Sequence, residues 1–196
     1  EEIPNLVALN VGGYRYMTRL STLCKYQDSM LASMFSGRHR LDKDSQGYYF
    51  IDSNGSMFVH ILEYLRNDTL PPNNLAAAVY KDACYYNIYP LMEELQLTPA
   101  VAQMVVKDNR REQFPDYFEV KKKVIRTAIA KAVTNHVGAV FIHAFREKIE
   151  PKAPYFNAQH VCVVSKANVV IGPWESPADK ESFIRCLEDD LITEGF

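Results

Sequence analysis

The chain has 196 residues and a formal net charge of −2, and 47% of its residues are hydrophobic and 23% charged. This composition is typical of a globular protein of one or two domains that buries a core without disulfides or metals. The weak negative charge argues against nucleic acid as a partner, and the apolar runs are too short for membrane insertion. Four separated cysteines without a C-x-x-C pair indicate reduced thiols, so we expect a cytoplasmic protein.

A β-hairpin is the first expected element. Val7, Leu9 and Val11 alternate with small or polar residues, which is typical of a half-buried strand. Gly12-Gly13 then supplies two residues that tolerate positive φ, as a tight hairpin turn requires. The pair could also approach a phosphate, but the turn alone explains it.

Short helices and one further strand are expected after the hairpin. Ser21 or Thr22 can begin a short helix, and Asp28 or Ser29 can begin a second one that ends at Gly37. A polar loop over 38–46 precedes a strand over 48–52. Apolar residues at helical spacing then predict helices from Ser56 to about residue 66, over 75–86 and over 88–95. These elements form an α+β domain over residues 1–98.

The segment 99–135 is expected to be a helical linker region. One or two helical turns over 101–106 precede a break at 111–116, and a long helix follows over 116–133. Asp116 and Glu119 form a predicted capping pair at its start. Its expected buried face consists of Val120, Val124, Ile125, Ala128, Ile129 and Ala132. The basic residues Lys121, Lys122, Arg126 and Lys131 are expected to be solvated, although such a face could also meet phosphates or anionic lipid.

Residues 136–196 are expected to form a small α/β domain. Strands are predicted over 137–145, 160–164 and 168–171, followed by a helix after Asp179. Trp174 lies between the last strand and this helix. Core packing is one interpretation of this tryptophan, and a partner-binding site in the C-terminal domain is the other.

No constellation of catalytic residues stands out. The sequence has no G-x-x-x-x-G-K-[ST], G-x-G-x-x-G, H-E-x-x-H or G-x-S-x-G motif, so we expect neither an enzyme nor a cofactor. His160 and Cys162, with His143 nearby, could place zinc ligands on one strand face. A half-buried pair of strands explains the same residues better, and no metal is expected.

Five short motifs occur in a fixed order along the first half. They are NVGG at 10–13, TRLSTL at 18–23, MFSG at 34–37, FID at 50–52 and F-x-x-I-L-x-Y-L-R at 58–66. This ordered set resembles the BTB/POZ (T1-like) domain of the potassium-channel tetramerisation-domain (KCTD) family. GPW at 172–174, followed by an acidic helix, resembles the C-terminal domain of some KCTD proteins. The resemblance implies no catalytic activity.

The resemblance also implies self-association into a closed ring, more often a homo-pentamer than a tetramer. Charged residues could set the register between neighbouring subunits or could pair within one subunit, and the candidates are Arg19, Asp52, Arg66 and Asp68.

Binding to cullin-3 is a further implication of the resemblance. The predicted contact surface consists of Met34, Phe35, Gly37, Arg38, Leu41, Tyr85 and Tyr86. Core packing is the alternative for Phe35. The chain would then be a substrate adaptor of a cullin-3 RING ubiquitin ligase whose C-terminal half holds an unknown protein substrate. The alternative function is an oligomeric scaffold or modulator of a channel or signalling protein that does not bind the cullin.

Overall fold

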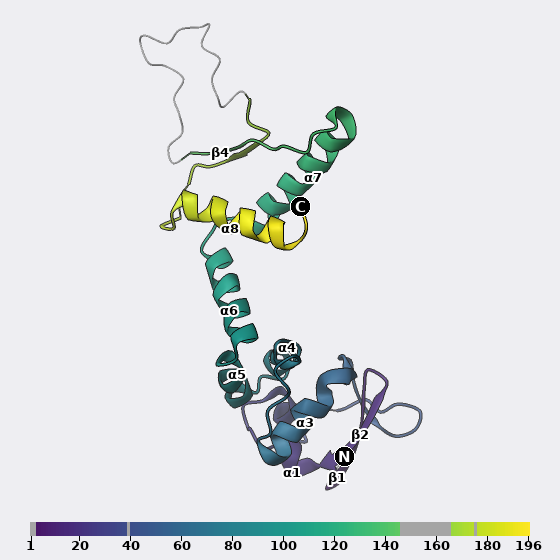
Figure 1. Ribbon diagram of the computed structural model, residues 1–196. Coiled ribbons are helices and arrows are strands. Elements are labelled where there is room, and N and C mark those ends of the chain that lie inside the picture. Colours follow the sequence, from purple (N-terminus) through teal and green to yellow (C-terminus); the bar gives the residue numbers. More distant parts are fainter. Residues whose placement is uncertain (1–2, 39, 146–165, 175) are drawn as a thin grey trace, which may run out of the picture. The chain divides into compact units, whose positions relative to one another are not determined.

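The computed structural model describes residues 3–38, 40–145, 166–174 and 176–196 (Figure 1). The chain forms two compact units, Glu1–Val106 and Lys107–Phe196. The mixture of helices and strands confirms the expected α+β class. The segment 99–135 is divided between the units, because its first helix crosses the boundary and its second lies wholly in the second unit.

A three-stranded sheet organises the first unit. Strand β1 (Leu6–Val11) pairs antiparallel with β2 (Tyr14–Arg19) and parallel with β3 (Tyr49–Ile51), which gives the order β2-β1-β3. The predicted hairpin is therefore present, and its turn has φ values of +52° at Gly12 and +92° at Gly13. The inward side chains of β1, from Val7, Leu9 and Val11, are fully buried.

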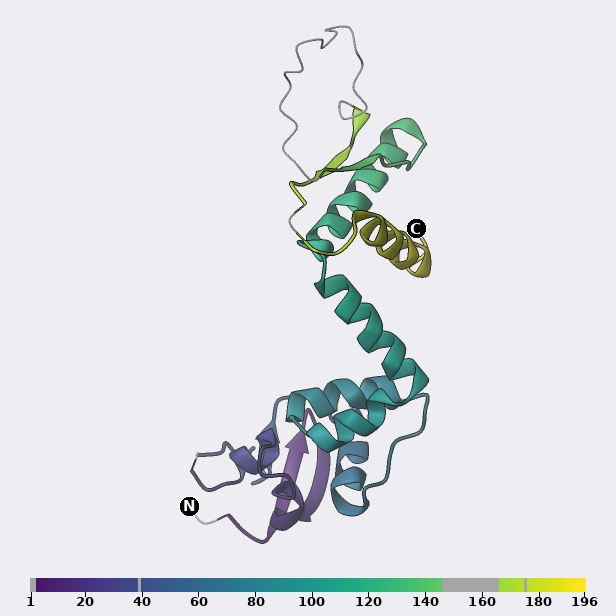
Figure 2. The ribbon, with the colours of Figure 1, turned by 90° about the vertical axis from the view of Figure 1, so that its left-hand side faces the viewer.

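Helices provide the rest of the core of the first unit (Figure 2). They are α1 (Leu20–Leu23), α2 (Met30–Met34), η1 (Gly55–Met57), α3 (Phe58–Asn67), α4 (Ala76–Tyr86) and α5 (Tyr89–Gln96). Ser29 caps α2 by accepting a hydrogen bond from the Ala32 N–H at 3.1 Å. The expected helix start at Ser56 is replaced by the short η1 helix, since the Asn54 side chain accepts the hydrogen bond of the Ser56 N–H.

The helical region after residue 98 differs from the prediction. Helix α6 (Pro99–Glu112) is continuous, so the break begins only at Gln113. An ion pair of 2.7 Å between Asp108 and Arg111 supports its last turn. The predicted capping pair is wrong: Asp116 has φ +52° and its side chain forms no cap, while Glu119 pairs with Lys122 at 2.8 Å.

The second unit packs two helices around a small sheet. It contains α7 (Tyr117–Asn135), β4 (Ile142–Ala144), β5 (Val169–Ile171) and α8 (Lys180–Thr193), and β4 and β5 are parallel. The strand expected over 160–164 lies outside the described residues. The strands expected over 137–145 and 168–171 are shorter than predicted. The predicted buried face of α7 is wrong at the C-terminal end of the helix, where Ile129 is 52% exposed and Ala132 is also exposed.

Candidate protein-binding surfaces

The segment between α2 and β3 begins in the core and then turns outward. Phe35, directly after α2, is buried with its ring edge-on to Tyr49 at 5.4 Å between centroids. Gly37 has φ +78°, a conformation that L side chains adopt with strain. This turn places Arg38 and Arg40 on the surface.

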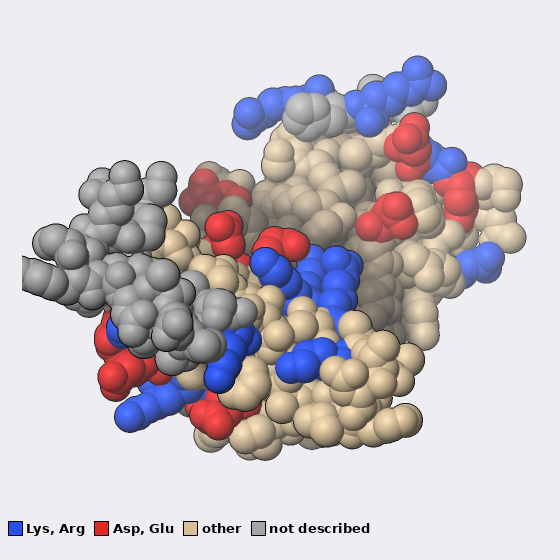
Figure 3. Space-filling view, turned by 90° about the horizontal axis from the view of Figure 1, so that it is seen from above, with Lys and Arg blue, Asp and Glu red and all other residues tan. Residues whose placement is uncertain are grey.

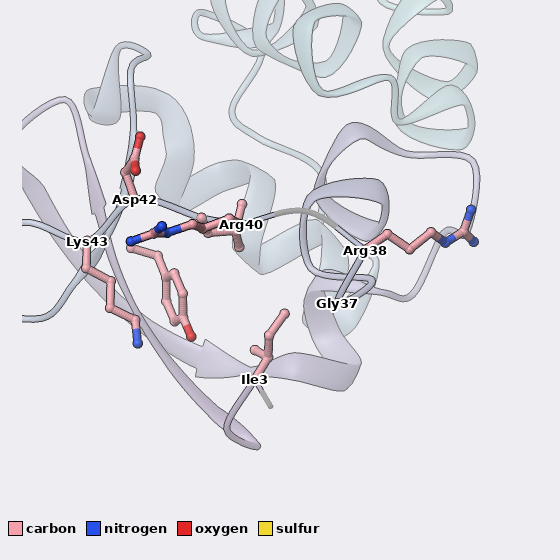
Figure 4. A pocket seen from close by; sticks show the side chains of 8 residues that line it. Ile3, Gly37, Arg38, Arg40, Asp42 and Lys43 are labelled. Atoms are coloured by element: carbon pink, nitrogen blue, oxygen red, sulfur yellow. The ribbon is translucent and has the colours of Figure 1, made fainter. Parts of the chain in front are cut away.

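A shallow pocket of about 660 Å³ adjoins this segment (Figure 4). Figure 4 shows Arg40, Asp42 and Lys43 on one side, whereas the Arg38 side chain points away from them. The Lys43 ammonium lies 4.7 Å from the centre of the Tyr49 ring. The pocket therefore combines basic groups with apolar side chains, which are those of Ile3, Leu41 and Tyr49.

The residues predicted to contact cullin-3 divide into surface and core positions. Gly37, Arg38 and Tyr85 are exposed, and Met34 and Leu41 are half-buried. Phe35 and Tyr86 are buried in the core of the single chain. Both side chains pack inward on aromatic rings: Phe35 on Tyr49 and Tyr86 on Phe58.

The charged residues predicted to set the register between subunits fall into two groups, those that form ion pairs within one subunit and those that form none. Asp68 pairs with Lys25 at 2.6 Å within the same subunit. Arg66 pairs with Glu63 at 3.0 Å and donates a second hydrogen bond to the Met17 carbonyl. Within the described part of the chain, Arg19 and Asp52 form no ion pair. Pairing within one subunit, the alternative that the sequence left open, therefore accounts for Arg66 and Asp68.

The outer face of the sheet exposes apolar side chains. Leu6 is 63% exposed, Met17 61% and Phe50 44%. Leu6 pairs across the strands with Arg19, and Ala8 with Met17, so these residues share one face. The loop after α2 covers the opposite end of this face, where Asn10 donates to Asp44 at 2.8 Å and Arg15 stacks on Tyr48. The sequence prediction missed this face, although the alternate positions of β1 and β2 carried the signal.

Trp174 belongs to the core of the second unit. Its side chain is buried, its ring lies 5.3 Å from that of Phe183, and its Nε1–H donates to the Ala178 carbonyl at 2.7 Å. Because the indole N–H already has a partner inside the unit, core packing, one of the two interpretations that the sequence left open, accounts for the position of Trp174.

A buried ionic network joins the helices of the second unit. Arg111 donates two hydrogen bonds to the Asp190 carboxylate, at 2.9 and 2.7 Å, and the Tyr117 hydroxyl donates a third at 2.8 Å. Lys121 lies 3.6 Å from the same carboxylate and 2.5 Å from Glu194. Burial alone would raise the pKa of Asp190, but these hydrogen bonds and charges outweigh it and lower the pKa.

This network corrects the expected basic face of α7. Lys121 is buried and paired with Asp190 and Glu194, so it does not belong to a solvated face. Lys122 and Arg126 are exposed as predicted. Among the described residues drawn in Figure 3, basic side chains lie in several separate groups, most of them next to acidic ones. This distribution does not favour a nucleic-acid surface.

The described residues contain no group of three or more His, Cys, Asp and Glu side chains that could hold a metal ion. His160 and Cys162, considered as zinc ligands, lie outside the described residues. No helix in the described ranges is both long and apolar enough to cross a bilayer.

Comparison with known proteins covers both units. The BTB/POZ domain matches residues 7–95, and the KCTD C-terminal domain matches residues 105–196. The BTB/POZ domain-containing protein KCTD14 of Homo sapiens is 33% identical over 197 aligned residues, which cover 97% of this chain and 76% of that protein.

Two further relatives match over a shorter stretch of the chain. The BTB/POZ domain-containing protein KCTD21 of Homo sapiens is 43% identical over 93 residues, which cover 46% of this chain and 36% of that protein. KCTD18 of Bos taurus is 42% identical over 93 residues, which cover 46% of this chain and 22% of that protein. Both domains are matched in order, and one relative is similar along nearly the whole of this chain. The chain therefore belongs to the KCTD family of BTB/POZ proteins.

Proposed function

We propose that this protein is a non-enzymatic, homo-oligomeric adaptor, a pentamer rather than a tetramer, that recruits a protein substrate to a cullin-3 RING ubiquitin ligase in the cytoplasm. Family membership supports the coarser role of an oligomerising adaptor. The first unit would form the ring and bind cullin-3. The second unit would hold the substrate.

The apolar outer face of the sheet is the observation that carries self-association. Leu6, Met17 and Phe50 are exposed to water together on one face of β1, β2 and β3. Contiguous exposed apolar side chains favour association, because burying them removes apolar area from water. A contact between this face and a different face of the next copy is heterologous, and repeated heterologous contacts form a ring when the rotation from copy to copy closes.

The segment after α2 supports cullin-3 binding. Gly37 and Arg38 are exposed, Met34 and Leu41 are half-buried, and an open pocket lies beside them. Half-buried apolar side chains with a basic rim are suited to a protein interface, since they lose water on binding while the rim remains polar. Phe35 and Tyr86 would support this surface from below. Tyr85 would contribute from α4.

A ring strengthens weak contacts. When one copy binds a cullin or a substrate, the neighbouring copies raise the effective concentration for the next contact. Small individual surfaces can then support stable complexes, as an adaptor requires.

Two measurements on the full chain test the proposal. Native mass spectrometry gives the mass of the assembly, and calorimetry gives the affinity for the cullin-3 N-terminal region. We expect a pentameric mass, and we expect Arg38→Glu to weaken cullin-3 binding by about tenfold or more with the mass unchanged. Arg185→Glu is the matched control, since Arg185 is exposed on α8 in the other unit.

The outcomes separate the parts of the proposal. A strictly monomeric chain would contradict the whole mechanism. An intact ring without cullin-3 binding at about 50 µM would exclude the ligase role, and a scaffold or modulator of a channel or signalling protein would replace it.

A further inference from the structure

Helix α7 carries apolar side chains on two of its sides. On the inner side, Tyr117 and Val124 are buried in the core of the second unit. On the outer side, Phe118 is 55% exposed, Ile129 52% and Val133 75%. A helix that packs on a core with one side normally presents polar residues to water on the other. The outer side of α7 therefore departs from the pattern of a helix that meets only water.

The exposed apolar residues of α7 form one stripe along the helix. Ile125 is half-buried and falls between Phe118 and Ile129 in the sequence. Helical spacing puts these three residues and Val133 on one side, over a length of about 22 Å. Single exposed apolar residues are ordinary on a protein surface, whereas a contiguous set of them marks an interaction site. We call Phe118, Ile125, Ile129 and Val133 the α7 stripe.

Basic side chains border one flank of the α7 stripe. Lys122 and Arg126 are both exposed and lie one helical turn apart, close to Phe118 and Ile129 by helical spacing. Lys122 pairs with Glu119 at 2.8 Å, but an exposed pair of this kind contributes little and is easily exchanged for another partner. Arg126 forms no ion pair within the described ranges. This flank therefore favours a negatively charged partner.

The other flank of the α7 stripe argues against a lipid surface. Glu194 of α8 is exposed and pairs with Lys121, and helical spacing puts Lys121 and Arg126 on opposite flanks. A flat anionic membrane would meet this carboxylate together with the basic flank, and the negative surface potential would repel it. A protein segment can instead place its acidic residues on the basic flank alone.

A second copy of α7 is also a poor partner for the stripe. Two identical stripes meet through a two-fold contact, in which each residue faces the corresponding part of the other copy. Arg126 lies near the middle of the stripe, so the two-fold contact would bring the Arg126 side chains of both copies together. Like charges that face each other across an interface are unfavourable.

We propose that the α7 stripe binds an amphipathic helix of the protein substrate, whose apolar side faces the stripe and whose acidic residues face Lys122 and Arg126. Two helices that cross at a shallow angle interlock their side chains over several turns, so a partner helix can follow the whole stripe. Amphipathic helices are commonly recognised in this way, through apolar residues three and four positions apart. This inference rests on the proposed function and names the class of substrate segment that the second unit would hold.

Synthetic helical peptides test the site on the full chain. The first peptide has about 16 residues, to match the length of the stripe, with leucines along one side and glutamates on one flank. The second has lysine in place of each glutamate, and the third has the composition of the first in scrambled order. Fluorescence anisotropy of the labelled peptides measures their affinities. We expect the glutamate peptide to bind about tenfold more tightly than either of the others.

Substitutions on the exposed side of α7 assign the binding to the stripe. We expect Ile129→Gln and Arg126→Glu each to weaken binding of the glutamate peptide by about tenfold, and Arg126→Glu to improve binding of the lysine peptide. Val106→Gln and Arg110→Glu on α6 are the matched controls, since Val106 is 65% exposed and Arg110 is also exposed. Both controls are expected to bind the glutamate peptide within about twofold of the wild type.

The outcomes separate this site from the proposed function. Equal affinities for the three peptides, or variants that behave like the controls, would overturn the site. An Ile129-dependent binding to phosphatidylserine vesicles without peptide binding would replace the substrate helix with lipid. A smaller assembly mass for Ile129→Gln would replace it with a second copy. If the wild type is monomeric or ignores cullin-3 but binds the glutamate peptide as expected, the proposed function fails and the helix-binding site stands.

Discussion

At the scale of single residues, the two glycines of the hairpin turn look alike in sequence but differ in structure. Both have positive φ. A Cβ on Gly12 would overlap the Ser53 carbonyl oxygen, whereas a Cβ on Gly13 would meet no atom within 4 Å. The turn was predictable from the Gly-Gly pair, but the close approach was not, because Ser53 arrives from a loop some forty residues later.

Alanine substitutions should separate these two requirements. We expect Gly13→Ala to lower the free energy of unfolding by about 1–2 kcal/mol, the cost of a left-handed conformation for an L side chain. Gly12→Ala adds steric overlap and is expected to cost about 3 kcal/mol or more. Urea unfolding followed by circular dichroism measures both, and equal losses would contradict the role assigned to Ser53.

Aromatic residues were the hardest to place from sequence. Phe35, Tyr86 and Trp174 were all considered as partner contacts, and all are buried. Their side chains pack on aromatic rings from distant segments, such as Phe58 against Tyr86 and Phe183 against Trp174. An aromatic side chain is expected to bury a large area, but the sequence does not show whether it does so in the core or against a partner.

At the scale of elements, Asp190 holds three helices together. Its partners Arg111, Tyr117 and Lys121 lie on α6 and α7, while Asp190 itself lies on α8. The burial of Lys121 could have been predicted from helical spacing. Lys121 follows Tyr117 by four residues and precedes Val124 by three, and Tyr117 and Val124 are both buried. The identity of its partner could not be predicted, because Asp190 is far away in sequence.

Removing this carboxylate should destabilise the second unit. We expect Asp190→Ala to lower its free energy of unfolding by about 3 kcal/mol, because Arg111 and Lys121 are left partly buried without their partner. Asp189→Ala is the matched control: Asp189 is an exposed neighbour on α8, and its loss should cost less than about 0.5 kcal/mol. Chemical denaturation of the full chain compares them, and similar losses would contradict the network.

The same variants give the expected pH dependence. The pKa of Asp190 is lower in the folded chain than in the unfolded one, so its contribution is present above about pH 4 and is lost as pH falls through the lowered folded pKa. Below about pH 4, wild type and Asp190→Ala should therefore converge in stability. A difference that stays constant down to about pH 2 would contradict this assignment.

At the scale of the whole molecule, the two halves have separate cores without a shared residue. The order of the motifs predicted both domains, and the comparisons confirm their family. The extent of α6 was not predictable from the charged run at its end, which resembled a break. Its charges instead support the helix, since Asp108 and Arg111 pair across one turn.

Separate cores predict two unfolding transitions. In calorimetry of the full chain, Gly12→Ala should lower only the transition of the first unit, and Asp190→Ala only that of the second. If the first unit forms the ring, its transition should also rise with protein concentration, because assembly stabilises only the folded form. A single transition that responds to both substitutions would contradict independent units.

The order of the hairpin and the helices along the chain has a consequence for how the protein is synthesised. The hairpin emerges from the ribosome before the helices, but Val7, Leu9 and Val11 share their core with helices that end near Leu95. At typical translation rates these roughly eighty residues take about 4–17 s to appear. During that interval the apolar side chains of β1 have no helices to cover them, so we expect newly made chains to be prone to aggregation until α5 has been synthesised.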